Sequence, residues 1–142
     1  GWGKFYEDGG LIISDRYTTS NAVHQGSKLP SSERGAFLDW LYDFEYQKIG
    51  LPAPDLVIYL DVPAEVSAKL AAMRKGKAGV QHDIHETDTE YLAACRDAAL
   101  DIAMHSGWTT INCTSGMALR SIEDIHEAVL AAVRPVLLKQ TA

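Results

Sequence analysis

The sequence predicts an α/β protein built on a parallel sheet with helices on both faces. Residues 11–15 and 56–60 are short apolar runs with the unbroken pattern of strands covered on both sides. A third strand is predicted at 109–113. Between these runs lie stretches in which apolar residues recur every three to four positions, as on one face of a helix. The resulting alternation of strands and helices is typical of a doubly wound sheet.

The predicted helices have recognisable boundaries. Residues 32–49 carry an apolar stripe at helical spacing. Its members are Phe37, Trp40, Leu41 and Phe44. We expect this stripe to lie in the core or at a subunit contact. Further helices are predicted from Pro63 to about residue 74, from about 87 to 105, and after Ser121, which suits a helix N-cap.

Length and composition limit the function classes. The 142 residues suit one domain, 1–142, and no apolar run approaches the ~20 residues of a membrane span. The net charge of −6 argues against a general nucleic-acid binder. The two cysteines, Cys95 and Cys113, are too few for a disulfide framework. We therefore expect a cytoplasmic protein whose thiols are reduced and serve packing.

The first candidate site follows the first predicted strand. Ligands of such sheets bind at the carboxyl ends of strands, which selects Asp15, Arg16 and Asp61. The planar guanidinium of Arg16 can hold a phosphate through two hydrogen bonds. Asn21 and Gln25 share a helix face four residues apart, and their amides suit the mixed edge of a pyrimidine. Taken alone, an Asp-Arg pair after a strand is more often a surface ion pair or a helix cap than a ligand site.

The second candidate is a basic loop at about residues 74–86. It carries three cations followed by two carboxylates: Arg74, Lys75, Lys77, Asp83 and Glu86. Positive charge on a loop that closes over phosphates is what phosphoryl transfer needs. A solvated loop at a helix end is the plainer alternative. His82 and His85 provide only two nitrogen ligands at helical spacing, so no metal site is predicted.

Several segments together resemble the thymidylate kinase family. Residues 15–25 are similar to its signature, an Asp-Arg-aromatic triplet followed by a serine. The resemblance continues through residues 38–41, Glu45, and the segments 51–56, 61–63 and 83–86. It implies the parallel sheet of P-loop NTPases and nucleoside monophosphate kinases. It also implies a phosphotransferase that takes a phosphate group as acceptor and converts dTMP to dTDP in dTTP biosynthesis.

The resemblance implies roles for individual residues. Arg16 would hold the dTMP phosphate, with Asp15 beside it, near the metal and the acceptor. Asn21 would face the thymine edge. The remaining implied dTMP contacts are Ser20, His24 and Gln25.

The lid, at about 74–86, would complete the site. Arg74, with Lys75 or Lys77, would reach the transferring phosphate. Asp83 and Glu86 would position the lid. The implied partners and cofactors are dTMP, ATP with Mg²⁺, and a second copy of the chain in a homodimer.

One family feature has no match in this sequence. The family begins with a strand and a Gly-x-x-x-x-Gly-Lys-Ser/Thr loop that cradles the ATP phosphates, and no such loop occurs here. The chain starts without Met and would supply strands three, four and five of the family order 2-3-1-4-5. The two edges beside the missing strand one would close on each other or stay unpaired. We expect this polypeptide, as a fragment, to be inactive alone.

Two other functions remain open at the level of sequence. The chain could be a non-catalytic module that binds a nucleotide or a partner protein. It could also serve a kinase for another pyrimidine monophosphate, because one methyl group is worth only about 1–3 kcal/mol of discrimination in a pocket.

Overall fold

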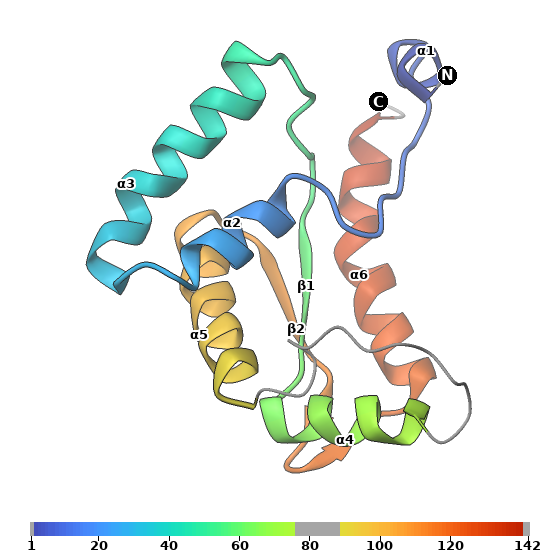
Figure 1. Ribbon diagram of the computed structural model, residues 1–142. Helices are drawn as coiled ribbons and strands as arrows, with labels where there is room; N and C mark the ends of the chain where they lie inside the picture. Colours follow the sequence, from blue (N-terminus) through green and yellow to red (C-terminus); the bar gives the residue numbers. More distant parts are fainter. Residues whose placement is uncertain (1, 76–88, 141–142) are drawn as a thin grey trace.

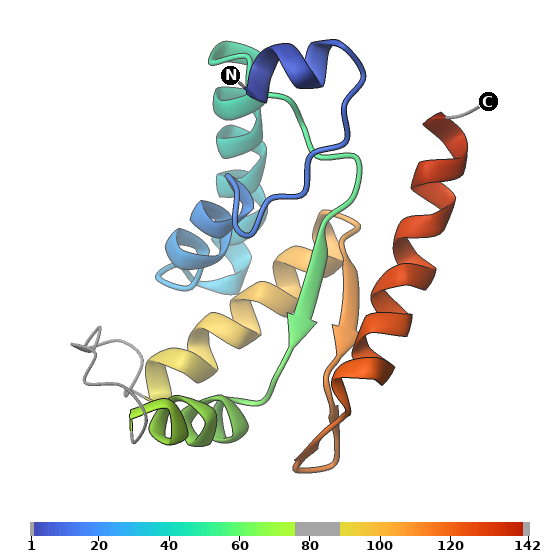
Figure 2. The same ribbon diagram turned by 90° about the vertical axis from the view of Figure 1, so that its right-hand side faces the viewer.

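The computed structural model describes residues 2–75 and 89–140. Its parallel sheet consists of β1 (Ile58–Asp61) and β2 (Thr109–Asn112), paired from Ile58↔Thr109 to Asp61↔Asn112. Helices α2 (Thr19–Gly26), α3 (Ser31–Tyr42) and α5 (Thr89–His105) lie on one side of these strands. Helix α6 (Ile122–Gln140) lies on the other side (Figure 2). The mixed α/β class, with helices on both faces, is confirmed.

The helix boundaries follow the local signals in the sequence. Pro63 precedes α4 (Ala64–Lys75), and its carbonyl accepts hydrogen bonds from the amides of Val66 and Ser67. The Ser121 hydroxyl accepts the amide of Asp124 at 3.0 Å, as expected of an N-cap before α6. Helix α3 continues as a π-helix, η1 (Asp43–Lys48), and Gly50 follows with φ +80°.

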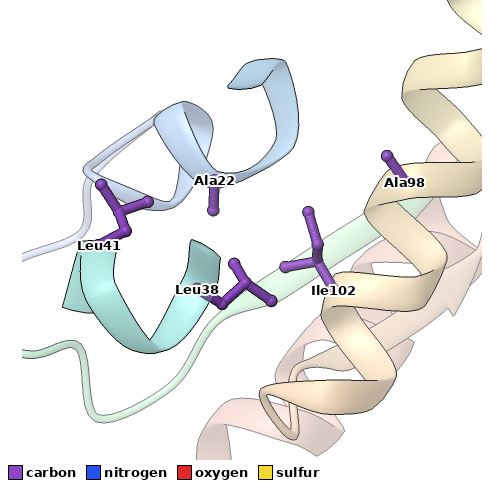
Figure 3. Packing of buried hydrophobic residues seen from close by; sticks show 5 residues of the cluster. All are labelled: Ala22, Leu38, Leu41, Ala98 and Ile102. Carbon is purple, nitrogen blue, oxygen red and sulfur yellow. The ribbon is translucent and has the colours of Figure 1, made fainter. Parts of the chain in front are cut away.

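The core lies between α2, α3 and α5 (Figures 1 and 3). Its five buried side chains are Ala22, Leu38, Leu41, Ala98 and Ile102. Small residues allow the two helices α2 and α5 to approach closely. A Cβ added to Gly26 would stand 3.0 Å from Cδ1 of Ile102. The backbone of α2 is therefore held against α5, and its opposite face is left open.

The predicted strand at 11–15 is wrong for this structure. These residues carry no strand assignment, and Ile13 is 87% exposed. A strand needs a hydrogen-bonded neighbour, and within the described residues β1 pairs only with β2. The segment therefore does not close on the free edge of β1, and Asp15-Arg16 follows an unpaired segment instead of a strand.

The expected apolar stripe also differs from the buried face of its helix. Trp40 is 56% exposed and Phe44 41%, with their rings stacked 5.7 Å apart. The buried side chains of α3 and η1 are Leu38, Leu41 and Glu45. Of the expected stripe, Leu41 is therefore in the core, and Phe37 packs partly buried against it. An aromatic stripe marks an apolar face, but the arrangement of the neighbouring helices decides which face is covered.

Some elements carry no strong sequence signal. Helix α1 (Trp2–Glu7) precedes the open segment, and the hairpin of β3 (Thr114–Ser115) and β4 (Ala118–Leu119) follows β2. Cys113 is buried and Cys95 half-buried, both as free thiols, which agrees with a packing role. Among the described helices, none combines the length and apolarity needed to span a bilayer.

Candidate functional site

The loop that carries Asp15 and Arg16 has an unusual backbone. Arg16 has φ 68°, a left-handed conformation that no other non-glycine residue adopts in the described part of the chain. Such a conformation costs on the order of 1–3 kcal/mol and persists where surrounding contacts impose it. The Ser14 hydroxyl donates to the Arg16 carbonyl, and the Tyr17 hydroxyl donates to the Pro52 carbonyl at 3.0 Å. These contacts hold both ends of the loop and leave the Arg16 side chain exposed.

Helix α2 carries the other predicted acceptor residues. Asn21, His24 and Gln25 are exposed, and Ser20 is half-buried. The opposite side of α2, at Ala22 and Gly26, is buried. The structure thus places the predicted residues along one open helix that directly follows the Arg16 loop. Their roles toward a substrate stay predictions.

Each of three exposed side chains on α2 contacts another part of the chain. Asn21 donates from Nδ2 to Oε1 of Glu45 at 3.2 Å. His24 Nδ1 lies 3.3 Å from the Tyr91 hydroxyl, at the start of α5. Gln25 Oε1 accepts a hydrogen bond from Lys28 at 3.5 Å. The helix is therefore connected to η1 on one side and to α5 on the other.

Asp61, at the carboxyl end of β1, is not open to a ligand. Arg96 of α5 binds its carboxylate through two hydrogen bonds, Nε to Oδ1 at 2.7 Å and Nη2 to Oδ2 at 2.9 Å. The side chain of Asp61 is 9% exposed and that of Arg96 32%. The hydrogen bond to Asp61 raises the pKa of Arg96. The pair joins α5 to the sheet, so the ligand role considered for Asp61 is replaced by a structural one.

The predicted lid is described only in part. Arg74 and Lys75 end helix α4, and their side chains are not described. The remaining predicted lid residues, Lys77, Asp83 and Glu86, lie outside the described residues, as do His82 and His85. Among the residues that are described, no cluster of three or more His, Cys, Asp or Glu side chains could hold a metal ion.

The hollows of the surface do not coincide with the predicted acceptor residues. One hollow, of about 230 Å³, lies between α3 and α5 and is lined by Arg34, Asp101 and His105. Another, of about 260 Å³, lies between η1, residues 53–57 and residues 106–108. Both are shallow, and Arg16 and Asn21 line neither. Function is therefore better judged from the chemistry of the open α2 face than from these hollows.

Three residues to which the sequence-based prediction gave no role contact residues of the candidate site or of its surroundings. Glu45 binds Asn21, Tyr46 shares a hydrogen bond with Thr18 at 2.7 Å, and Arg96 holds Asp61. A usable signal existed for Glu45. It lies seven residues after Leu38 and four after Leu41, so a carboxylate occupies the core face of its helix. No comparable signal marks Arg96, which is 35 residues from its partner.

Comparison with known proteins identifies one family. The thymidylate kinase family model matches residues 4–129. The thymidylate kinase of Limosilactobacillus fermentum is 32% identical over 126 residues, which cover 88% of this chain and 56% of the relative. That of Mycobacterium tuberculosis is 32% identical over 81 residues, 56% of this chain and 38% of the relative. The chain thus spans about half the length of the curated relatives it matches. No solved structure matches significantly.

Proposed function

Because the chain belongs to the thymidylate kinase family, we propose that the complete protein transfers the γ-phosphate of ATP to dTMP, giving dTDP for dTTP synthesis. In this proposal the fold is that of a P-loop NTPase, and the chain provides the acceptor half of the site. The placement of the Arg16 loop directly before the open face of α2 carries the proposal. This order along the chain would let the Arg16 guanidinium hold a phosphate while the amides of Asn21 and Gln25 face a base.

In the proposed reaction the residues of this chain bind and orient the acceptor. Arg16 holds the dTMP phosphate, Asn21 and Gln25 face the base, and Ser20 and His24 line the approach between them. The left-handed backbone of Arg16 pre-sets the loop, so less ordering is needed when the phosphate binds. Catalysis by such a site comes mainly from position and electrostatics.

The donor side of the reaction needs groups beyond those described. Asp15 is an exposed carboxylate with no hydrogen bond to another described residue, a donor that fits Mg²⁺, which is often bound by one or two carboxylates plus phosphates. When bound, Mg²⁺ would neutralise charge on the ATP phosphates. Arg74, with Lys75 or Lys77, supplies the lid cation, held by Asp83 and Glu86. The 142 residues contain no Gly-x-x-x-x-Gly-Lys-Ser/Thr loop, so we infer that they do not transfer phosphate by themselves.

The exposed aromatic face of α3 and η1 supports a homodimer. Trp40 and Phe44 stack with ring planes 8° apart, and Ile49 nearby is 54% exposed. Exposed aromatic residues that lie together are typical of interface cores. We expect Trp40→Asp to turn a dimer of the complete protein into a monomer in sedimentation velocity. An unchanged sedimentation coefficient would place the subunit contact elsewhere.

A cytoplasmic location is part of the same proposal.

Calorimetric titration with dTMP tests the acceptor site directly. The complete encoded protein should bind dTMP, and Arg16→Ala should abolish saturable binding because the phosphate loses its bidentate partner. Met104→Ala, at an 82% exposed position of α5, is the control and should bind like the parent. Equal affinity in the parent and Arg16→Ala would refute the assignment of Arg16. A turnover assay with dTMP and ATP then separates a kinase from a module that only binds.

A further inference from the structure

A buried carboxylate lies directly behind the open face of α2. Glu45 is only 5% exposed, although it belongs to a residue type that is rarely buried without a partner. Its Oε1 accepts the hydrogen bond from Asn21 at 3.2 Å. Its Oε2 is also buried and has no hydrogen-bond partner within the described residues. Such a half-satisfied buried carboxylate costs stability, which indicates a role other than stabilising the fold.

The surroundings of Glu45 connect it to the acceptor site. Tyr46, the next residue of η1, reaches Thr18 at the start of α2. Burial, and then the charge of Glu45, raise the pKa of Tyr17. Burial also raises the pKa of Tyr46; the hydrogen bond with Thr18 opposes this rise, and the charge of Glu45 adds to it by a smaller amount. Both tyrosines therefore stay protonated at neutral pH. The Tyr17 hydroxyl binds the Pro52 carbonyl and the Tyr46 hydroxyl binds Thr18, so neither hydroxyl is a hydrogen-bond partner of the Glu45 carboxylate.

A π-helix places these two side chains. The backbone of η1 departs from α-helical geometry at Asp43–Lys48, and it presents Glu45 and Tyr46 to Asn21 and Thr18. Thr18 is the N-cap residue immediately before α2, three residues before Asn21, so the two lie on the same side of the start of this helix. Single π-helical turns of this kind occur frequently at functional sites.

The chemistry of the contact determines how the Asn21 amide is oriented. An ionised carboxylate can only accept hydrogen bonds, so the amide nitrogen must face Glu45. The amide oxygen then points elsewhere, and it has no other hydrogen bond among the described residues. An amide that is free to rotate by 180° exchanges its donor and acceptor. An amide held by Glu45 presents them in one order.

We propose that Glu45 is a positioning residue that fixes the Asn21 amide and thereby selects a base with a ring N–H donor beside a carbonyl. Thymine presents that pair. Cytosine presents an unprotonated ring nitrogen beside an amino group, the reverse order of donor and acceptor. The inference rests on the proposed acceptor site and adds the group that gives it base preference.

Titration of dTMP and dCMP into the complete encoded protein tests the inference. Glu45→Gln keeps the size of the side chain but can itself rotate, so Asn21 can turn over. We expect the dTMP-over-dCMP affinity ratio to fall by about fivefold or more, chiefly because dCMP binds better. Glu127→Gln, at an exposed position of α6, is the matched control and should leave the ratio unchanged.

A double-mutant cycle separates positioning from a general structural effect. If Glu45 acts through Asn21, Glu45→Gln should not change the ratio further in an Asn21→Ala background. Additive effects on the ratio would overturn the inference. So would an unchanged ratio in a folded Glu45→Gln variant that still binds dTMP.

Two further outcomes are informative. Asn21 is exposed, so Asn21→Ala should fold even if Glu45→Gln does not, and an unchanged ratio in Asn21→Ala overturns the inference by itself. If neither the parent nor the control binds either nucleotide, the proposed function fails, and the inference fails with it. An unchanged ratio in Asn21→Ala refutes only the role of Glu45 and leaves the proposed acceptor site intact. Absence of nucleotide binding in the parent refutes the acceptor site as well.

Discussion

Replacing Ile102 by alanine removes the side chain that packs α2 against α5. Ile102 is fully buried, and its Cδ1 lies where a Cβ on Gly26 would come within 3.0 Å (Figure 3). The substitution deletes three carbon groups, each worth about 0.8 kcal/mol of transfer free energy, or about 2.4 kcal/mol together. The cavity left between three helices adds about 1–2 kcal/mol. We therefore expect the free energy of unfolding to fall by about 3–4 kcal/mol.

Urea unfolding followed by circular dichroism and tryptophan fluorescence measures this loss. Trp108 packs against the same cluster and should report the transition. For a chain of this length, about 3 kcal/mol corresponds to a fall of about 10 °C in Tm. Met104→Ala on the same helix is the control, because its side chain is 82% exposed, and it should change stability by less than about 0.5 kcal/mol. A loss below about 1 kcal/mol in Ile102→Ala would refute the packing of α2 on α5 described above.

Three other predictions concern the loop, the buried ion pair and pH. Arg16→Gly should raise the free energy of unfolding by about 1 kcal/mol, because glycine adopts φ 68° without strain. The same variant should no longer bind dTMP. A lower free energy of unfolding in urea titration would contradict the strain argument. Arg96→Met should cost about 2–3 kcal/mol, less than a fully buried pair because the arginine is 32% exposed, and a neutral result would mean that Asp61 finds another partner. Burial raises the pKa of Tyr42 and Tyr59 above the ordinary value of 10.0, so the folded chain holds these protons more tightly than the unfolded chain. The stability they contribute is complete below about pH 10 and is lost as pH rises through the folded-state pKa, so thermal unfolding at pH 9 to 11 should show a falling Tm, with a smaller slope in Tyr42→Phe.

Local patterns in the sequence were sufficient for most helices. The cap at Ser121, the proline before α4 and the glycine after η1 act within one or two turns of backbone, so no distant partner is needed to predict them. A helix that carries Asn21 and Gln25 on one face was also expected, and α2 confirms the helix. The parallel pairing of β1 with β2 agrees with the sheet expected from the alternation of strands and helices along the chain.

The expected acceptor roles rest on the family resemblance, because the local context of these residues does not predict them. An Asp-Arg pair or a helix with two amides is common, so residues 15–25 alone leave a surface ion pair open. The agreement of residues 15–25 with the family signature, together with the family match over residues 4–129, favours a substrate-binding role over a surface ion pair. The roles of the individual side chains still depend on binding experiments.

Only the tertiary structure decided which surfaces are covered and which groups are paired. Residues 11–15 have the composition of a strand but remain unpaired, because a strand exists only beside a neighbour that accepts its hydrogen bonds. Trp40 and Phe44 are apolar yet exposed, while Glu45 is charged yet buried, because α2 covers the other face of their helix. The contacts of Glu45 with Asn21 and of Arg96 with Asp61 join residues 24 and 35 positions apart. Such contacts depend on how whole helices pack, which no local pattern of residues contains.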